Sequence, residues 1–86
     1  MNAEKLQEIL SSDFVWLYLA SLISADVLDS KEKCIESLEK LNFIKDNIDK
    51  LELSEEVKNK IIDYSIKGID IVNRDLKDYE TLGNSR

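Results

Sequence analysis

The sequence predicts an all-α domain, a small bundle of four or five helices. Three observations lead to this fold class. The 86 residues include no proline and only 2 glycines, whereas β architectures need more turn residues. The composition, 43% hydrophobic and 35% charged, is typical of a folded chain rather than a disordered one. Apolar residues recur at three- and four-residue steps, which is the period of a helix.

A short amphipathic helix is expected at the start of the sequence. Asn2 can cap it, because an Asn side chain accepts a hydrogen bond from the free amides of a first turn. The apolar side chains on its inner side are Leu6, Ile9 and Leu10. The polar cluster at 11–13 then predicts a break, with Asp13 as the N-cap of the next helix.

Residues 14–28, FVWLYLASLISADVL, are expected to form a buried central helix. At about 100° per residue their apolar side chains point in almost every direction, as in a segment covered by protein on all sides. The stretch is shorter than the ~20 residues of a membrane-spanning helix, and Ser21, Ser24 and Asp26 interrupt it. We therefore predict a core element and no membrane contact.

The third helix begins at a predicted capping box. Asp29 accepts from the amide of Glu32, and the Glu32 side chain turns back to the amide of Asp29. The end of this helix has two interpretations. Asn42 in a left-handed conformation ends the helix and folds Phe43 back onto its last turn, and a short helix from about 46 to 51 follows. If the helix instead continues, Phe43 and Ile35 become candidates for an exposed partner-binding patch.

A long last helix is predicted over about 55–81. Ser54 caps it, and Glu55 and Glu56 occupy the first turn, where the helix dipole favours acids. Its apolar residues span an arc of about 220°, which two other elements or a second protein must cover. Gly68 lies in this arc, which indicates the close approach of another backbone. Gly83 should end the helix. The single domain then covers 1–82, and 83–86 form a disordered tail.

The charges limit the kinds of partner. The 18 acidic and 12 basic residues give a net charge of −6, and the basic residues are scattered among the acids. Nucleic acid requires a contiguous positive patch, so direct binding is not expected. One cysteine, Cys34, allows no internal disulfide and suits a reducing compartment. Because no secretion signal is recognised, the expected location is cytoplasmic.

Catalytic chemistry is not expected. The chain has no histidine, which removes the usual general base and the usual partner of a nucleophilic Ser or Cys. Cys34 should be an inert thiol on the inner face of its helix. With only two glycines in the chain, no glycine-rich phosphate loop is present. We therefore predict that the protein is not an enzyme and needs no cofactor.

One group of carboxylates can be interpreted as a metal site. Asp26, Asp29 and Glu32 supply three oxygen donors within seven residues at a helix junction, and hard divalent cations such as Ca²⁺ bind clustered carboxylates. Capping alone also accounts for Asp29 and Glu32. Asp26 is the residue that capping leaves unexplained.

Residues 17–43, which include LASLISADVLDSKEKCIESLEKLNF, resemble the helical signature of the tellurite-resistance TerB-like family. In this resemblance Ala25-Asp26 matches the Ala-Asp that ends an apolar helix, Glu32 the downstream acid, and Leu41-Asn42-Phe43 the helix stop. The turn glycine of that signature is missing here. The resemblance implies a metal-binding helical accessory domain of a stress or phage-defence system.

The residues themselves favour a different function, an acidic protein-interaction module of the adaptor, inhibitor or immunity type. Such a module acts through a protein partner or as a homodimer. Aromatic and large aliphatic side chains carry much of the binding energy of interfaces. The candidate contacts are Trp16, Ile35, Phe43, Tyr64 and Tyr79.

Overall fold

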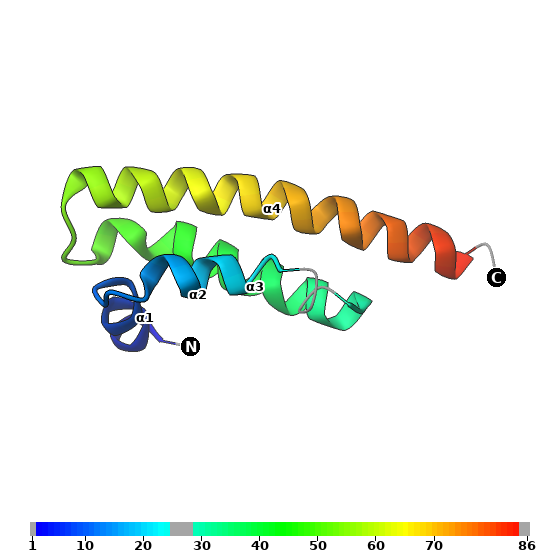
Figure 1. The fold of residues 1–86 in the computed structure, drawn as a ribbon, viewed down its shortest axis with the longest axis horizontal. Helices are drawn as coiled ribbons and strands as arrows, with labels where there is room; N and C mark the ends of the chain where they lie inside the picture. Colours follow the sequence, from blue (N-terminus) through cyan, green and yellow to red (C-terminus); the bar gives the residue numbers. More distant parts are fainter. Residues whose placement is uncertain (1, 25–28, 85–86) are drawn as a thin grey trace.

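The structure is a computed structural model, and it describes residues 2–24 and 29–84. This part of the chain contains four α-helices, one short 3-10 helix and no strand, so the predicted all-α class is confirmed (Figure 1). The elements are α1 (Ala3–Leu10), α2 (Val15–Ser21), α3 (Lys31–Asn47), η1 (Ile48–Lys50) and α4 (Glu55–Asn84). The predicted long last helix is therefore also confirmed.

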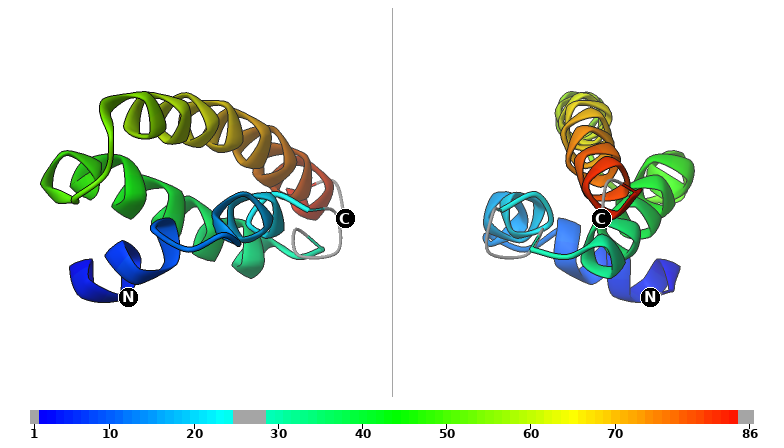
Figure 2. Two further views of the ribbon diagram at one scale, coloured as in Figure 1. Left: turned by 60° about the vertical axis from the view of Figure 1, so that its left-hand side comes forward. Right: turned by 90° about the vertical axis from the view of Figure 1, so that its right-hand side faces the viewer.

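An antiparallel pair, α3 and α4, forms the body of the molecule, whose extents are 47 × 19 × 17 Å. α2 runs beside this pair, and α1 lies at the end where η1 leads from α3 towards α4 (Figures 1 and 2). The long axis of the molecule follows α4, because a helix rises about 1.5 Å per residue. The pair gives α1 and α2 a surface on which to pack.

The hydrophobic core lies along the α3–α4 pair and continues beneath α1 and α2. Leu41, Ile44 and Ile48 follow one another at three- and four-residue steps and are fully buried. Burying a large aliphatic side chain stabilises the fold by about 1.5–3 kcal/mol. The other buried apolar residues are Leu6, Leu10, Val15, Leu19, Leu22, Cys34, Leu51, Ile61 and Val72.

α2 is not the buried central helix that the sequence predicts. It buries only one face, through Val15, Leu19 and the adjacent Leu22, while Phe14 and Leu17 are each 69% exposed. A chain of 86 residues buries a limited fraction of its surface, and here the α3–α4 pair covers α2 from one side only. Among the described helices, none combines the length and the apolar character that a membrane crossing requires.

α3 continues past Asn42, so the predicted end of the helix at that residue is wrong. The Asn42 side chain donates from Nδ2 to the Leu38 carbonyl oxygen at 2.9 Å, and among the described residues no non-glycine residue has positive φ. The buried side chains of Leu41 and Ile44 lie on either side of Asn42 in the sequence. If the helix ended here, Ile44 and Ile48 would leave the buried row that begins at Leu41. The free energy gained by burying these side chains outweighs the local preference of one asparagine for a helix end.

Two predicted helix starts are confirmed by their caps. Lys5 N donates to Asn2 Oδ1 at 2.8 Å at the start of α1. Val57 N donates to Ser54 Oγ at 3.3 Å at the start of α4. In both cases the cap accepts from the amide three residues later, the geometry that makes Asn and Ser favourable at this position.

The starts of α2 and α3 each differ from the prediction by one residue. Phe14, not Asp13, occupies the N-cap position of α2, and it makes no side-chain cap hydrogen bond. Ser12, not Asp13, orders the turn before α2: its hydroxyl accepts from Phe14 N at 3.2 Å and donates to the Ile9 carbonyl at 2.7 Å. The turn therefore uses the hydroxyl as both donor and acceptor, whereas the carboxylate of Asp13 can only accept.

Ser30, not Asp29, caps α3, and it accepts from Lys33 N at 3.3 Å. Asp29 instead pairs with the Lys33 ammonium at 3.2 Å. Its carboxylate lies one residue too early to reach the amide at the third helical position, but it does reach the long side chain of Lys33.

The end of α4 also differs from the prediction, because the helix passes through Gly83 and reaches Asn84. Among the described glycines none has the positive φ of a helix stop. The first two residues of the predicted tail at 83–86 therefore belong to α4, and residues 85–86 lie outside the described part.

Gly68 has the packing role that its position predicts, although side chains rather than a backbone approach it. A Cβ at Gly68 would lie 3.2 Å from Ile23 Cγ2 and 3.3 Å from Leu41 Cδ1. Such distances are shorter than ordinary carbon–carbon contacts. The missing side chain therefore allows α3 and the end of the α2 segment to approach α4 together.

Hydrogen bonds join α1 to the segment before α4, and they were not predicted from the sequence. The Gln7 side chain accepts from Glu52 N at 2.7 Å and donates to the Glu52 carbonyl at 3.2 Å. Its amide also donates to Ser11 Oγ at 2.7 Å. A side-chain amide that satisfies both backbone groups of one residue fixes how α1 lies against the η1 end of the molecule.

Candidate protein-binding surface

The outer side of α2 is the largest concentration of exposed apolar side chains along a short segment of the described chain. Phe14 and Leu17 are each 69% exposed, and Trp16 is 43% exposed. We call these three residues the α2 face. Their exposed area is of the order of a few hundred Å², the size at which an apolar patch on a monomer is often functional.

Local sequence explains why the α2 face is held outward. Val15, Leu19 and Leu22 recur at four- and three-residue steps and anchor one side of the helix in the core. The positions on the opposite side of the helix, among them Leu17, then face solvent. The sequence contains no charged residue from position 14 to position 25 to make that side polar. The segment is therefore anchored on one side and apolar on the other.

Trp16 and Tyr64, two of the predicted contact residues, are brought together at the edge of the α2 face. Their ring centroids are 6.1 Å apart and the ring planes are inclined at 56°. Tilted aromatic pairs at this separation are favourable by about 0.5–1.5 kcal/mol beyond the area they bury. The pair joins α2 to α4, and Tyr64 is itself half-buried.

The wide apolar arc of α4 is covered in its middle and exposed at both edges. Ile61 and Val72 are fully buried, whereas Ile66 is 53% exposed and Ile71 is 38% exposed. Ile71 lies two turns after Tyr64 and on the same flank of the helix, next to the α2 side. Ile66 lies on the opposite flank, so it serves as a matched exposed isoleucine away from α2.

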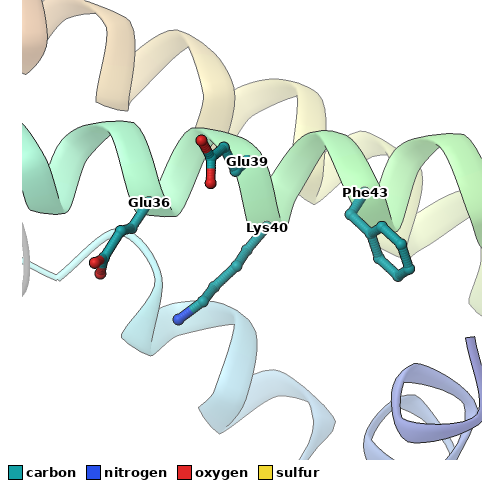
Figure 3. Close-up of a pocket in the computed structure, with 4 residues that line it drawn as sticks. All are labelled: Glu36, Glu39, Lys40 and Phe43. Atoms are coloured by element: carbon teal, nitrogen blue, oxygen red, sulfur yellow. The ribbon is translucent and has the colours of Figure 1, made fainter. Parts of the chain in front are cut away.

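Phe43 borders a shallow pocket on α3 of about 240 Å³, which is lined by Glu36, Glu39, Lys40 and Phe43. Figure 3 shows Glu36 and Lys40 pointing from α3 towards α2, and the Phe43 ring turned towards the α1 side. Phe43 is half-buried and packs against the core. Phe43 was a candidate contact only if the helix continues past Asn42, and α3 does continue.

Ile35 is 39% exposed on α3. It does not line the pocket that contains Phe43. Eight residues separate the two, which places them about two turns apart and about 80° apart around the helix axis. A common patch of Ile35 and Phe43 therefore stays a prediction.

Tyr79 packs against the core at the other end of the molecule, near Cys34. Burial raises the pKa of the Tyr79 phenol, and the charges of Cys34, Asp29 and Asp75 raise it further. Burial also raises the pKa of the Cys34 thiol, with Asp75 and Asp29 adding to the effect. Cys34 is fully buried, as predicted for a core thiol, and its thiolate is disfavoured.

The predicted carboxylate metal site is described only in part. Asp26 lies outside the described residues. Asp29 and Glu32 are exposed at the start of α3, and Asp29 is paired with Lys33. The described residues hold no group of three or more potential metal ligands. The site at Asp26, Asp29 and Glu32 therefore stays a prediction.

Sequence reasoning identified Trp16 but missed Phe14 and Leu17, which are the most exposed members of the α2 face. The sequence carried no signal for their exposure, because a charge-free apolar segment has the same pattern whether its outer side is buried or exposed to solvent. Comparison of the chain with protein-family models, with curated proteins and with solved structures gives no match.

Proposed function

We propose that this chain is a non-enzymatic protein-interaction module that binds its partner through the α2 face. The observation that carries the proposal is the pair Phe14 and Leu17, each 69% exposed, the first at the N-cap of α2 and the second within this helix, which contains no charged residue. Each would lose unfavourable contact with water when a partner covers it. An adaptor, an inhibitor or an immunity protein requires such a surface.

The composition of the α2 face supports docking rather than incidental exposure. Single apolar residues are common on protein surfaces, but contiguous apolar patches mark interaction sites. Trp and Phe are enriched at the centres of interfaces. Trp16 is held by its contact with Tyr64, so an aromatic anchor is already oriented before a partner binds.

The chemical groups of the chain also support a role in binding. There is no histidine to act as general base. Cys34 is buried, and its raised thiol pKa disfavours the nucleophilic thiolate. The pocket at Phe43 contains carboxylates and one ammonium but neither hydroxyl nor thiol.

The test is a double variant, Phe14→Ser/Leu17→Gln, with Ile66→Gln as control. Serine suits the N-cap position that Phe14 occupies, and glutamine forms helices about as well as leucine, so the fold should be retained. The measurement is the retention of a stoichiometric partner during affinity purification, together with the sedimentation coefficient of the purified chain.

We expect wild type and Ile66→Gln to retain the same partner, and the double variant to bind it at least about tenfold more weakly, as the loss of two apolar contacts predicts. Retention of that partner by the double variant at wild-type affinity would place the binding surface elsewhere. A wild-type chain that is recovered alone and sediments as a monomer would count against the proposal as a whole.

A further inference from the structure

We draw no further inference here: the strongest candidate, the exposed apolar face of α2 at Phe14, Trp16 and Leu17, belongs to the surface already proposed for partner binding, and nothing in the structure shows what covers it.

Discussion

Ser65 lies on the buried side of α4, and its hydroxyl oxygen has no hydrogen-bond partner. A buried polar group without a partner costs roughly 1–3 kcal/mol relative to the hydrated group. Serine is tolerated here because it is small, next to the close approach at Gly68. Ser65 therefore fills space in the core, but its unpaired hydroxyl lowers the stability of the fold.

Replacing this hydroxyl should stabilise the protein. We expect Ser65→Ala to raise the free energy of unfolding by about 1 kcal/mol, because it removes an unsatisfied group and introduces a better helix former. Ser12→Ala is the control. Its hydroxyl makes two hydrogen bonds in the turn before α2, so the same substitution should lower stability by about 1 kcal/mol. Denaturant unfolding measures both, and a loss of stability in Ser65→Ala would show that its hydroxyl has a partner.

The helix caps show where a residue type in the local sequence predicts the start of a helix and where it does not. Asn2 and Ser54 cap the helices that they precede, as predicted. At the start of α3, two consecutive residues, Asp29 and Ser30, can both act as the cap, and the structure uses Ser30. The local sequence alone does not distinguish these two cap positions.

Substitutions at Asn42 test whether α3 is continuous. In an uninterrupted helix, Asn42→Ala should be more stable than Asn42→Gly by about 1 kcal/mol, the difference in helix propensity. Both variants lose the side-chain bond to Leu38, so that loss cancels. If Asn42 ended the helix in a left-handed conformation, the glycine variant would be the more stable of the two.

Asn59 is the control for this difference in stability between the alanine and glycine variants. It is exposed and lies inside α4, whose continuity is not in question. Asn59→Ala should exceed Asn59→Gly in stability by a similar amount. Thermal or denaturant unfolding of the four variants gives both differences, and opposite signs at the two positions would contradict a continuous α3.

The sequence supports two interpretations of α3 because local and non-local terms conflict there. Asparagine and the aromatic that follows it are typical of a helix end, and they favour a stop at Asn42. The stripe of Leu41, Ile44 and Ile48 favours continuation, but its burial is known only once α4 is seen to lie against it. The candidate site at Phe43 inherits this ambiguity, since it exists only on the continuous helix.

At the scale of the whole molecule, the helical class and the long last helix follow from periodicity, composition and caps. The central position of α2 does not follow. An apolar residue on every face predicts a covered helix, yet the pattern is identical whether the cover comes from the same chain or from another protein. With α3 and α4 on one side only, Phe14 and Leu17 remain bare. The error in the fold and the candidate binding surface are thus one feature.

The most direct measurement is the free energy of unfolding of Phe14→Ser/Leu17→Gln in the isolated chain. If the α2 face is an exposed docking surface, the double variant should unfold within about 0.5 kcal/mol of wild type, as surface substitutions do. Leu19→Ala, on the buried side of the same helix, should lose about 2–5 kcal/mol. A loss in the double variant as large as that of Leu19→Ala would show that the outer side of α2 is core, and would contradict the account.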